Sequence, residues 1–336
     1  MKKKLGFILS LFISIIFLLL ALKKVNAKEI GESLLKANLL YFLLAILITF
    51  IAFLLRAIRW KILLSPLKKL PLSMVFNATM IGFMCNYLLP ARVGEVIRAY
   101  LIGTRGKISK SAAFATIIVE RVMDIFILSL FAAIILIFFP VPLYFKKIGV
   151  VIFILNTLIF VILVIMHNKS AAFIRIIEKP LSIFGEKIKE KIKTLLFAFI
   201  KGLNILRNRS NLLLAAVLSL CIWSITGLLF YVLFFSFPIR LPPHAAFFDM
   251  IILTFGIMIP STSGFIGTFQ FFTKEGLMIF HVDPNIALSY SILLYISQFL
   301  LVVGVGLVSL WLWGLSFKNL KTKTYSYNSP EKKQKQ

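Results

Sequence analysis

The chain has 336 residues, of which 60% are hydrophobic, and it carries a formal net charge of +26 with a mean hydropathy of +0.98. This apolar share exceeds that of soluble domains, and its long uncharged runs predict an all-α polytopic membrane protein. The lysines and arginines gather between the apolar runs, so we expect them to set topology and to attract anionic lipid headgroups, not to bind nucleic acid.

The cysteines and histidines argue against two further kinds of site. Cys85 and Cys221 lie in separate apolar runs, so no disulfide framework or paired-cysteine metal motif is present. The three histidines are scattered and lack the spacing of metal ligands. We therefore predict neither a metal site nor a cofactor.

Six apolar runs are long enough to span a membrane as helices. The first follows three lysines and resembles a secretory signal peptide, but its 18 residues are longer than the usual apolar core of such a peptide. This length favours an uncleaved first span. The six runs are 5–22, 39–55, 111–139, 148–166, 211–236 and 287–315.

Two further apolar regions, 74–98 and 247–280, are each interrupted by the pattern Pro-x-x-x-Gly. Their arms are about 14 to 17 residues long, which is short for a complete span. We therefore predict two re-entrant helical hairpins, with their irregular backbone buried in protein or lining a cavity.

The two breaks occupy matching positions. Pro90 and Pro260 lie 170 residues apart, as do Gly94 and Gly264, and Asn86 precedes the first break. Proline and glycine that interrupt apolar segments at corresponding positions of two halves indicate a transporter site.

The distribution of basic residues predicts the topology. With both termini in the cytoplasm, 29 lysines and arginines fall on the cytoplasmic side and 8 on the other side, as the positive-inside rule requires. Three spans per half then make the halves, about 5–139 and 148–315, an inverted repeat. We expect one transmembrane domain over 1–315 and a disordered basic tail over 316–336.

The first break carries charge. Arg92, Glu95 and Arg98 follow Pro90 with a spacing that keeps them near one helix face. The paired N–H donors of an arginine guanidinium match the oxygens of a phosphate. Glu95 can orient an arginine or bind a substrate amine. We predict a substrate-binding role, against the alternative that the three form an ion pair that only fixes the hairpin.

A second charged group lies within a predicted span. Glu120, Arg121 and Asp124 would be costly against lipid, so we expect them to face the bundle interior. They could form a polar transport path or a proton-coupled group. The alternative is a structural ion pair that clamps this span to the first hairpin.

Basic and aromatic residues close the second predicted span. Arg56 and Arg59 share a helix face, and Trp60 fits an interfacial aromatic belt. Headgroup binding and simple snorkelling of the arginines to the interface remain equally open.

The second break offers hydroxyls and free backbone amides. Such groups at a helix N-terminus can bind an anionic group, although small residues also permit close helix packing. The candidate residues are Ser261, Thr262, Ser263, Gly264, Gly267 and Thr268.

No catalytic motif emerges: the sequence has no Gly-x-Ser-x-Gly, no Walker A motif and no His-Glu-x-x-His. We therefore expect no enzymatic activity.

Several motifs together resemble the lysylphosphatidylglycerol synthase transmembrane-region family, whose members are flippase-like. The motifs are Arg56-x-x-Arg59-Trp60, the run from Asn86 to Arg98, Glu120-Arg121-x-x-Asp124 and the run from Pro260 to Gln270. The family includes the membrane part of enzymes that aminoacylate phosphatidylglycerol and move the product outward. The chain resembles that membrane part alone, over about 5–315, so the resemblance does not imply synthase activity. Many relatives have proline where this chain has Ser263, which implies a less rigid turn here.

Three functions follow as hypotheses. The first is a flippase-like transporter in the cytoplasmic membrane of a prokaryote, moving an anionic phospholipid, an aminoacyl-phospholipid or a polyprenyl-phosphate lipid. Arg92, Arg98 and the turn 261–268 would hold the lipid phosphate, and the group around Glu120 would line the route. The second is a membrane enzyme that modifies a lipid head, with Glu95 or Glu120 as base. The third is a scaffold for a lipid-modifying enzyme partner.

Overall fold

The chain folds into a bundle of helices. The structure, a computed structural model, describes residues 2–89, 93–139, 143–168, 186–203, 208–259 and 263–315. Every regular element in these ranges is helical, and they contain no β-strand. The predicted all-α class is confirmed.

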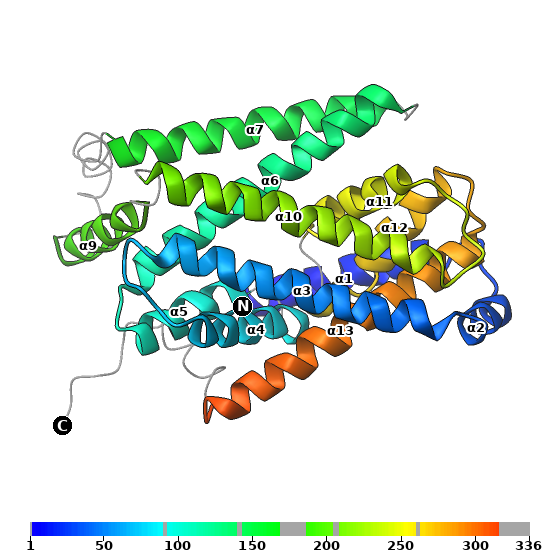
Figure 1. The fold of residues 1–336 in the computed structure, drawn as a ribbon, viewed down its shortest axis with the longest axis horizontal. Helices are drawn as coiled ribbons and strands as arrows, with labels where there is room; N and C mark the ends of the chain where they lie inside the picture. Colours follow the sequence, from blue (N-terminus) through cyan, green and yellow to red (C-terminus); the bar gives the residue numbers. More distant parts are fainter. Residues whose placement is uncertain are drawn as a thin grey trace.

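Figure 1 shows the helices in their order along the chain. They are α1 (Lys2–Ala21), α2 (Ala27–Leu35), α3 (Leu39–Leu64), α4 (Leu72–Leu88), α5 (Gly94–Gly106), α6 (Lys110–Phe138), α7 (Leu143–Asn168), α9 (Glu186–Gly202), α10 (Arg209–Phe234), α11 (Pro243–Gly256), α12 (Thr268–Met278) and α13 (Pro284–Leu312), with a short 3₁₀-helix, η4, at Ser263–Phe265.

Four helices, α3, α6, α10 and α13, are long and apolar enough to cross a membrane. They coincide with four of the six predicted spans, and the chain is an integral membrane protein. The other two predicted spans fall on α1 and α7, in which the described residues include the apolar stretches Leu11–Ala21 and Gly149–Ile162. The total of six spans stays a prediction.

Side-chain caps explain where the four long helices begin. Asn38, Ser109 and Asn208 each accept a hydrogen bond from a backbone amide of the first turn that follows. Asp283 accepts bonds from two such amides, and Pro284 occupies the first helical position, where no amide hydrogen is needed. Each long apolar run is thus started by a polar residue that satisfies otherwise unpaired donors.

Both predicted breaks interrupt helices. The first separates α4 from α5 and the second separates α11 from α12, and the two helices of each pair contact one another. Figure 1 shows α4 and α5 toward one end of the bundle and α11 and α12 toward the other. Pro90 and Pro260 themselves lie outside the described residues. The side of the membrane from which each hairpin enters stays a prediction.

Helix order and helix contacts repeat between the two halves. Helices α3, α4, α5 and α6 have 26, 17, 13 and 29 residues, and α10, α11, α12 and α13 have 26, 14, 11 and 29. Helix α4 packs against α13 of the other half, as α11 packs against α6, and α3 packs against α10 at the centre. This arrangement fits an internal repeat, and its inversion across the membrane stays a prediction.

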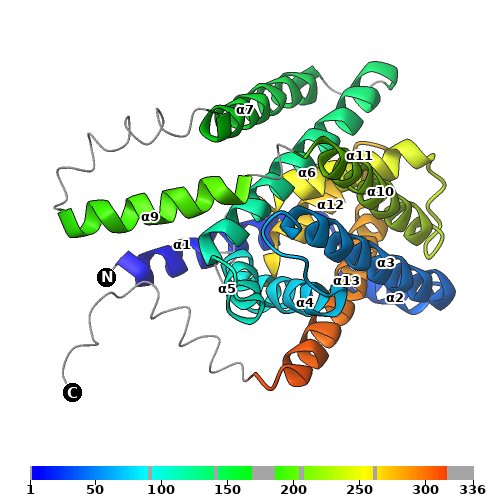
Figure 2. The same ribbon diagram turned by 60° about the vertical axis from the view of Figure 1, so that its left-hand side comes forward.

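Two helices lie beside α6. Helix α7 packs against it and stands apart from the rest of the bundle in Figure 2. The basic amphipathic helix α9 also packs on α6, where the Ser111 hydroxyl donates a hydrogen bond of 2.8 Å to the Leu195 carbonyl. The predicted disordered tail, 316–336, lies outside the described residues.

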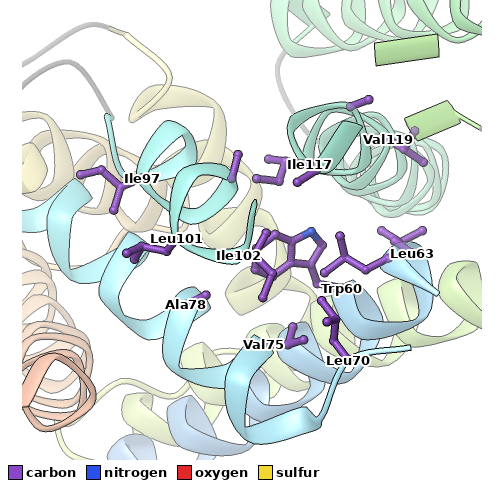
Figure 3. Packing of buried hydrophobic residues seen from close by; sticks show 14 of the residues in the cluster. Trp60, Leu63, Leu70, Val75, Ala78, Ile97, Leu101, Ile102, Ile117 and Val119 are labelled. Atoms are coloured by element: carbon purple, nitrogen blue, oxygen red, sulfur yellow. The ribbon is translucent and has the colours of Figure 1, made fainter. Parts of the chain in front are cut away.

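Trp60 lies in a hydrophobic core and not at the interface where its position after an apolar run had suggested. Helix α3 continues to Leu64, and Trp60 is 0% exposed. Figure 3 shows its ring among side chains of α4, α5 and α6, including Val75, Ile102 and Ile117. Its Nε1 donates to Thr116 Oγ1 at 3.0 Å, which satisfies the indole inside the core.

We expect Gly94→Ala to destabilise the fold. A Cβ at Gly94 would overlap the carbonyl oxygen of Gly82 and lie 2.5 Å from Asn86 Oδ1, so the arms of the first hairpin would have to separate. Such overpacking costs about 1–3 kcal/mol. Thermal unfolding in detergent would show a lower Tm.

The matched control is Gly304→Ala in α13, where a Cβ would meet no atom within 4 Å. Alanine there removes only the conformational freedom of glycine, so we expect an unchanged or slightly higher Tm. Equal Tm values for the two variants would contradict the close contact.

Candidate functional site

A buried network of charges joins α3 to α6. Arg59 and Glu120 are both 0% exposed. Arg59 Nη1 lies 2.5 Å from Asp124 Oδ1, and its Nη2 lies 3.3 Å from Glu120 Oε1. Glu120 and Asp124 are one turn apart, so one guanidinium bridges both carboxylates.

Arg98 extends this network to α5 of the first hairpin. Its two terminal nitrogens each donate to one oxygen of Glu120 at 3.2 Å, and its guanidinium stacks 4.2 Å from the centre of the Trp60 ring. A Cβ at Gly82 would overlap the aliphatic part of Arg98. Glycine is therefore needed at position 82 for the arginine to reach Glu120.

Asp124 is also held from α10. Trp223 Nε1 donates to Asp124 Oδ1 at 2.9 Å, and the Ser219 hydroxyl accepts a bond of 2.7 Å from Arg59. Sequence reasoning did not identify Ser219 or Trp223. Their spacing of one helical turn on a span was the available signal.

A more accessible ion pair lies at the edge of the network. Arg121 Nε contacts Glu95 Oε1 at 2.8 Å, and these side chains are 28% and 23% exposed. Arg121 also approaches Asp124, with Nη1 3.6 Å from Oδ2. This contact links α5 to α6, and it brings Glu95 of the first break to the charged group predicted within α6.

The described network has one more positive charge than negative charge. Four arginines, at 56, 59, 98 and 121, face three carboxylates, at 95, 120 and 124. Arg56 is the most loosely paired, with Nη1 4.0 Å from Asp124 Oδ2 and its guanidinium 5.1 Å from the centre of the Trp223 ring. A buried charge without a close partner is costly, so an anion beside Arg56 would be stabilising.

A cavity of about 190 Å³ opens beside Arg56. Its charged wall consists of Arg56, Glu95, Arg121 and Asp124, and its remaining surface is largely aromatic and aliphatic. Both hairpins and the central helices α3, α6, α10 and α13 contribute to it. The cavity therefore offers both charged and apolar lining between the two halves of the chain.

The two breaks meet next to this cavity. Gly264 has φ of +74°, and a Cβ there would lie 3.1 Å from the carbonyl oxygen of Tyr87 and 2.7 Å from the Tyr295 hydroxyl. The rings of Tyr87 and Phe265 lie 5.9 Å apart, and both residues line the cavity. The described parts of the two breaks therefore contact each other beside the cavity.

Backbone amides next to both breaks are satisfied by local side chains. Asn86 Oδ1 accepts a 2.8 Å bond from Gly94 N, and Gln270 Oε1 accepts a 2.8 Å bond from Gly267 N. The Thr268 hydroxyl donates to the Phe265 carbonyl at 2.8 Å. These bonds stabilise the turns, while anion binding by Gly264, Gly267 and Thr268 stays a prediction.

Some predicted site residues cannot be placed. Arg92, Ser261 and Thr262 lie outside the described residues, as does the side chain of Ser263. Within the described ranges, no group of three or more histidine, cysteine, aspartate or glutamate side chains is arranged to hold a metal ion.

Known proteins resemble this chain over most of its length. The family model for the lysylphosphatidylglycerol synthase TM region matches residues 7–306. A UPF0104 membrane protein of Methanothermobacter thermautotrophicus is 23% identical over 310 residues, which cover 86% of this chain and 90% of that protein.

Two UPF0104 membrane proteins of Methanocaldococcus jannaschii are also similar. One is 28% identical over 134 residues, covering 39% of this chain and 40% of the relative. The other is 27% identical over 230 residues, which cover 68% of this chain and 93% of the relative. No solved structure matches this chain at a significant level.

We expect Glu120→Gln to destabilise the bundle strongly. The change removes the carboxylate that pairs with Arg98 and helps to pair Arg59, and leaves buried positive charge uncompensated. Breaking such a pair costs about 3–5 kcal/mol. Unfolding monitored by circular dichroism in detergent measures the loss.

Glu190→Gln on α9 is the control, because Glu190 is 59% exposed and lies 4.0 Å from Lys193. An exposed pair contributes little, so stability should hardly change. Similar losses in the two variants would refute the structural importance of the buried network.

Proposed function

Because the chain belongs to the lysylphosphatidylglycerol synthase TM-region family, which supports a membrane function related to lipids, we propose that it moves a lipid with an anionic headgroup between leaflets. The observation that carries this proposal is Arg56, a loosely paired arginine facing the cavity where the two hairpins meet. The lipid would be an anionic phospholipid, an aminoacyl-phospholipid or a polyprenyl-phosphate lipid.

The cavity chemistry suits a lipid phosphate. Guanidinium groups bind phosphate oxygens through charge-assisted hydrogen bonds. In this proposal Arg56 and Arg121 contact the phosphate, and Glu95 releases Arg121 or binds an amine on the headgroup. Arg98 is buried and already paired with Glu120, so in this proposal Arg98 positions Glu120. Arg92 and the residues 261–268 complete the binding site from the two breaks.

The arrangement of the hairpins supports alternating access. They approach from opposite ends of the bundle and contact each other beside the cavity (Figure 1). Movement of one hairpin relative to the other would open the cavity, as in transporters built from repeated broken helices. We propose the cytoplasmic membrane of a prokaryote as the location, with both termini in the cytoplasm, because that orientation satisfies the distribution of basic residues.

Transport is tested with Arg56→Gln in phosphatidylcholine vesicles that contain fluorescent phosphatidylglycerol. Loss of a charge-assisted hydrogen bond costs about 1.5–3 kcal/mol, so the transfer rate should fall at least about tenfold. Quenching of the outer-leaflet fluorophore measures the rate. Arg92→Ala tests the predicted contact from the first break in the same assay.

The matched control is Arg105→Gln, since Arg105 stacks on Trp313 at 4.4 Å and lies outside the cavity lining. Its rate should equal that of the unaltered protein. If Arg56→Gln and Arg121→Gln both transport at the full rate, the binding role of the cavity is wrong.

A second candidate function rests on Glu95. This carboxylate lines the cavity and is partly exposed, so it could act as a base toward a bound headgroup. We propose transport without covalent change and expect labelled lipid to be recovered with its mass unaltered. A changed mass that Glu95→Gln abolishes would establish the enzymatic alternative. Activity that appears only with a co-purified lipid-modifying enzyme would indicate a scaffold.

A further inference from the structure

The second hairpin contains an isolated carboxylate. Asp249 on α11 is 0% exposed, and neither of its oxygens has a hydrogen-bond partner in the described parts of the chain. The buried carboxylates of Glu120 and Asp124 differ in this respect, because both contact arginines. Asp249 is therefore not part of the charged network beside the cavity.

The surroundings of Asp249 come chiefly from the other arm of the hairpin. A Cβ at Gly276 of α12 would overlap Asp249 Oδ1, so the carboxyl group packs directly against the α12 backbone. Thr273 lies one turn before Gly276 on the same face, is 0% exposed, and its hydroxyl also lacks a described partner. Two unpartnered polar groups thus face the contact between α11 and α12.

The charged groups of these two helices do not neutralise Asp249. The Lys274 ammonium donates to the carbonyls of Ala21 at 3.0 Å and Lys23 at 2.7 Å, at the end of α1. Glu275 lines a separate apolar cavity between α7 and α11, and the His244 ring stacks on Phe139 at 3.6 Å.

Among the side chains that the structure describes, the neighbouring helices supply no counter-charge either. Tyr290 of α13 is close to Asp249, but its hydroxyl donates to the Phe230 carbonyl at 2.9 Å. On α6, Arg121 pairs with Glu95 and Asp124, and Lys110 lies over the Tyr100 ring. The described titratable residues of α10 are Arg209 at its start, Cys221, which is exposed, and Tyr231.

A carboxylate in this position is stable only when it is uncharged or when water reaches it. Burial of an isolated charge is strongly unfavourable, whereas a protonated carboxyl group can be accommodated among apolar side chains. The closed contact between Asp249 and Gly276 therefore requires a proton on the carboxyl group. Loss of that proton favours separation of α11 from α12, because separation admits water.

We propose that Asp249 is a proton-binding site whose occupancy is coupled to closure of the α11–α12 hairpin. A proton moves from water to one oxygen of Asp249, and the hairpin then closes on Gly276. When the hairpin opens toward water, the proton leaves and the carboxylate is solvated. If the proposed lipid transport is correct, this site links the movement of the second hairpin to a pH difference across the membrane.

The first experiment does not depend on lipid transport. Infrared spectra of the purified protein should show a protonated-carboxyl band that Asp249→Asn removes and Glu275→Gln retains. Spin labels at the exposed positions Leu228 and Ile266, with Cys221 replaced by serine, report the position of the hairpin tip relative to α10. The distance should change with pH, and Asp249→Asn, a close mimic of the neutral acid, should hold it at the low-pH value.

The second experiment uses vesicles with a pH difference. If one proton is coupled to each lipid, one pH unit shifts the lipid distribution between leaflets by up to about tenfold. Asp249→Asn should lose this shift, while Glu275→Gln should keep it. Replacement of sodium by potassium in the buffer should change nothing, and a dependence on sodium would overturn the assignment of a proton.

The outcomes separate this proposal from the proposed transport. If no lipid moves but Asp249→Asn removes the pH response of the hairpin, transport is refuted and the proton site stands. If lipid moves and neither the carboxyl band nor the pH response depends on Asp249, the proton site is refuted and transport stands.

Discussion

The ion pair of Arg59 with Glu120 and Asp124 is the contact on which the central part of the bundle depends. A buried guanidinium and two buried carboxylates are tolerable only when each group finds a partner. Helices α3 and α6 supply these groups, and α5 and α10 complete them through Arg98 and Trp223. Four helices from both halves are consequently held in one register, since displacement of any of them would leave a buried charge or donor unpaired.

The same requirement explains the small residues of the first hairpin. The Arg98 side chain passes α4 at Gly82, where a Cβ would overlap it, and Gly94 lets the backbone of α5 approach the Gly82 carbonyl. Trp60 then lies under the Arg98 guanidinium and fills the space between α3, α4 and α5. Glycine, tryptophan and arginine therefore act together: the glycines allow the approach, and the stacked ring shields the ion pair from water.

Local signals in the sequence were enough to predict the long apolar helices and the two breaks, but not the short helix α2. Apolar runs, the residues that cap them and Pro-x-x-x-Gly all act within a few positions of the chain. The pairing of Arg59 with Glu120 was not predictable in this way, because it depends on how α3 and α6 pack. Trp60 was assigned to the interface since it follows an apolar run, but α5 covers it in the fold. In the sequence Asp249 is a single polar residue near the start of an apolar segment, and only its enclosure by α12 makes it unusual.

The two repeated halves differ chemically at equivalent positions. Counted at an offset of 170 residues, Glu95 corresponds to Phe265 and Arg98 to Thr268. The first hairpin is thus tied to α6 by ion pairs. Within the described residues the second hairpin makes no ion pair to α6: Lys274 donates to backbone carbonyls at the end of α1, and Asp249 has no partner. Ion pairs inside a membrane protein resist displacement, while an apolar contact around a protonatable group has a stability that depends on its protonation. This difference favours a fixed first hairpin that holds the charged wall of the cavity and a second hairpin that moves.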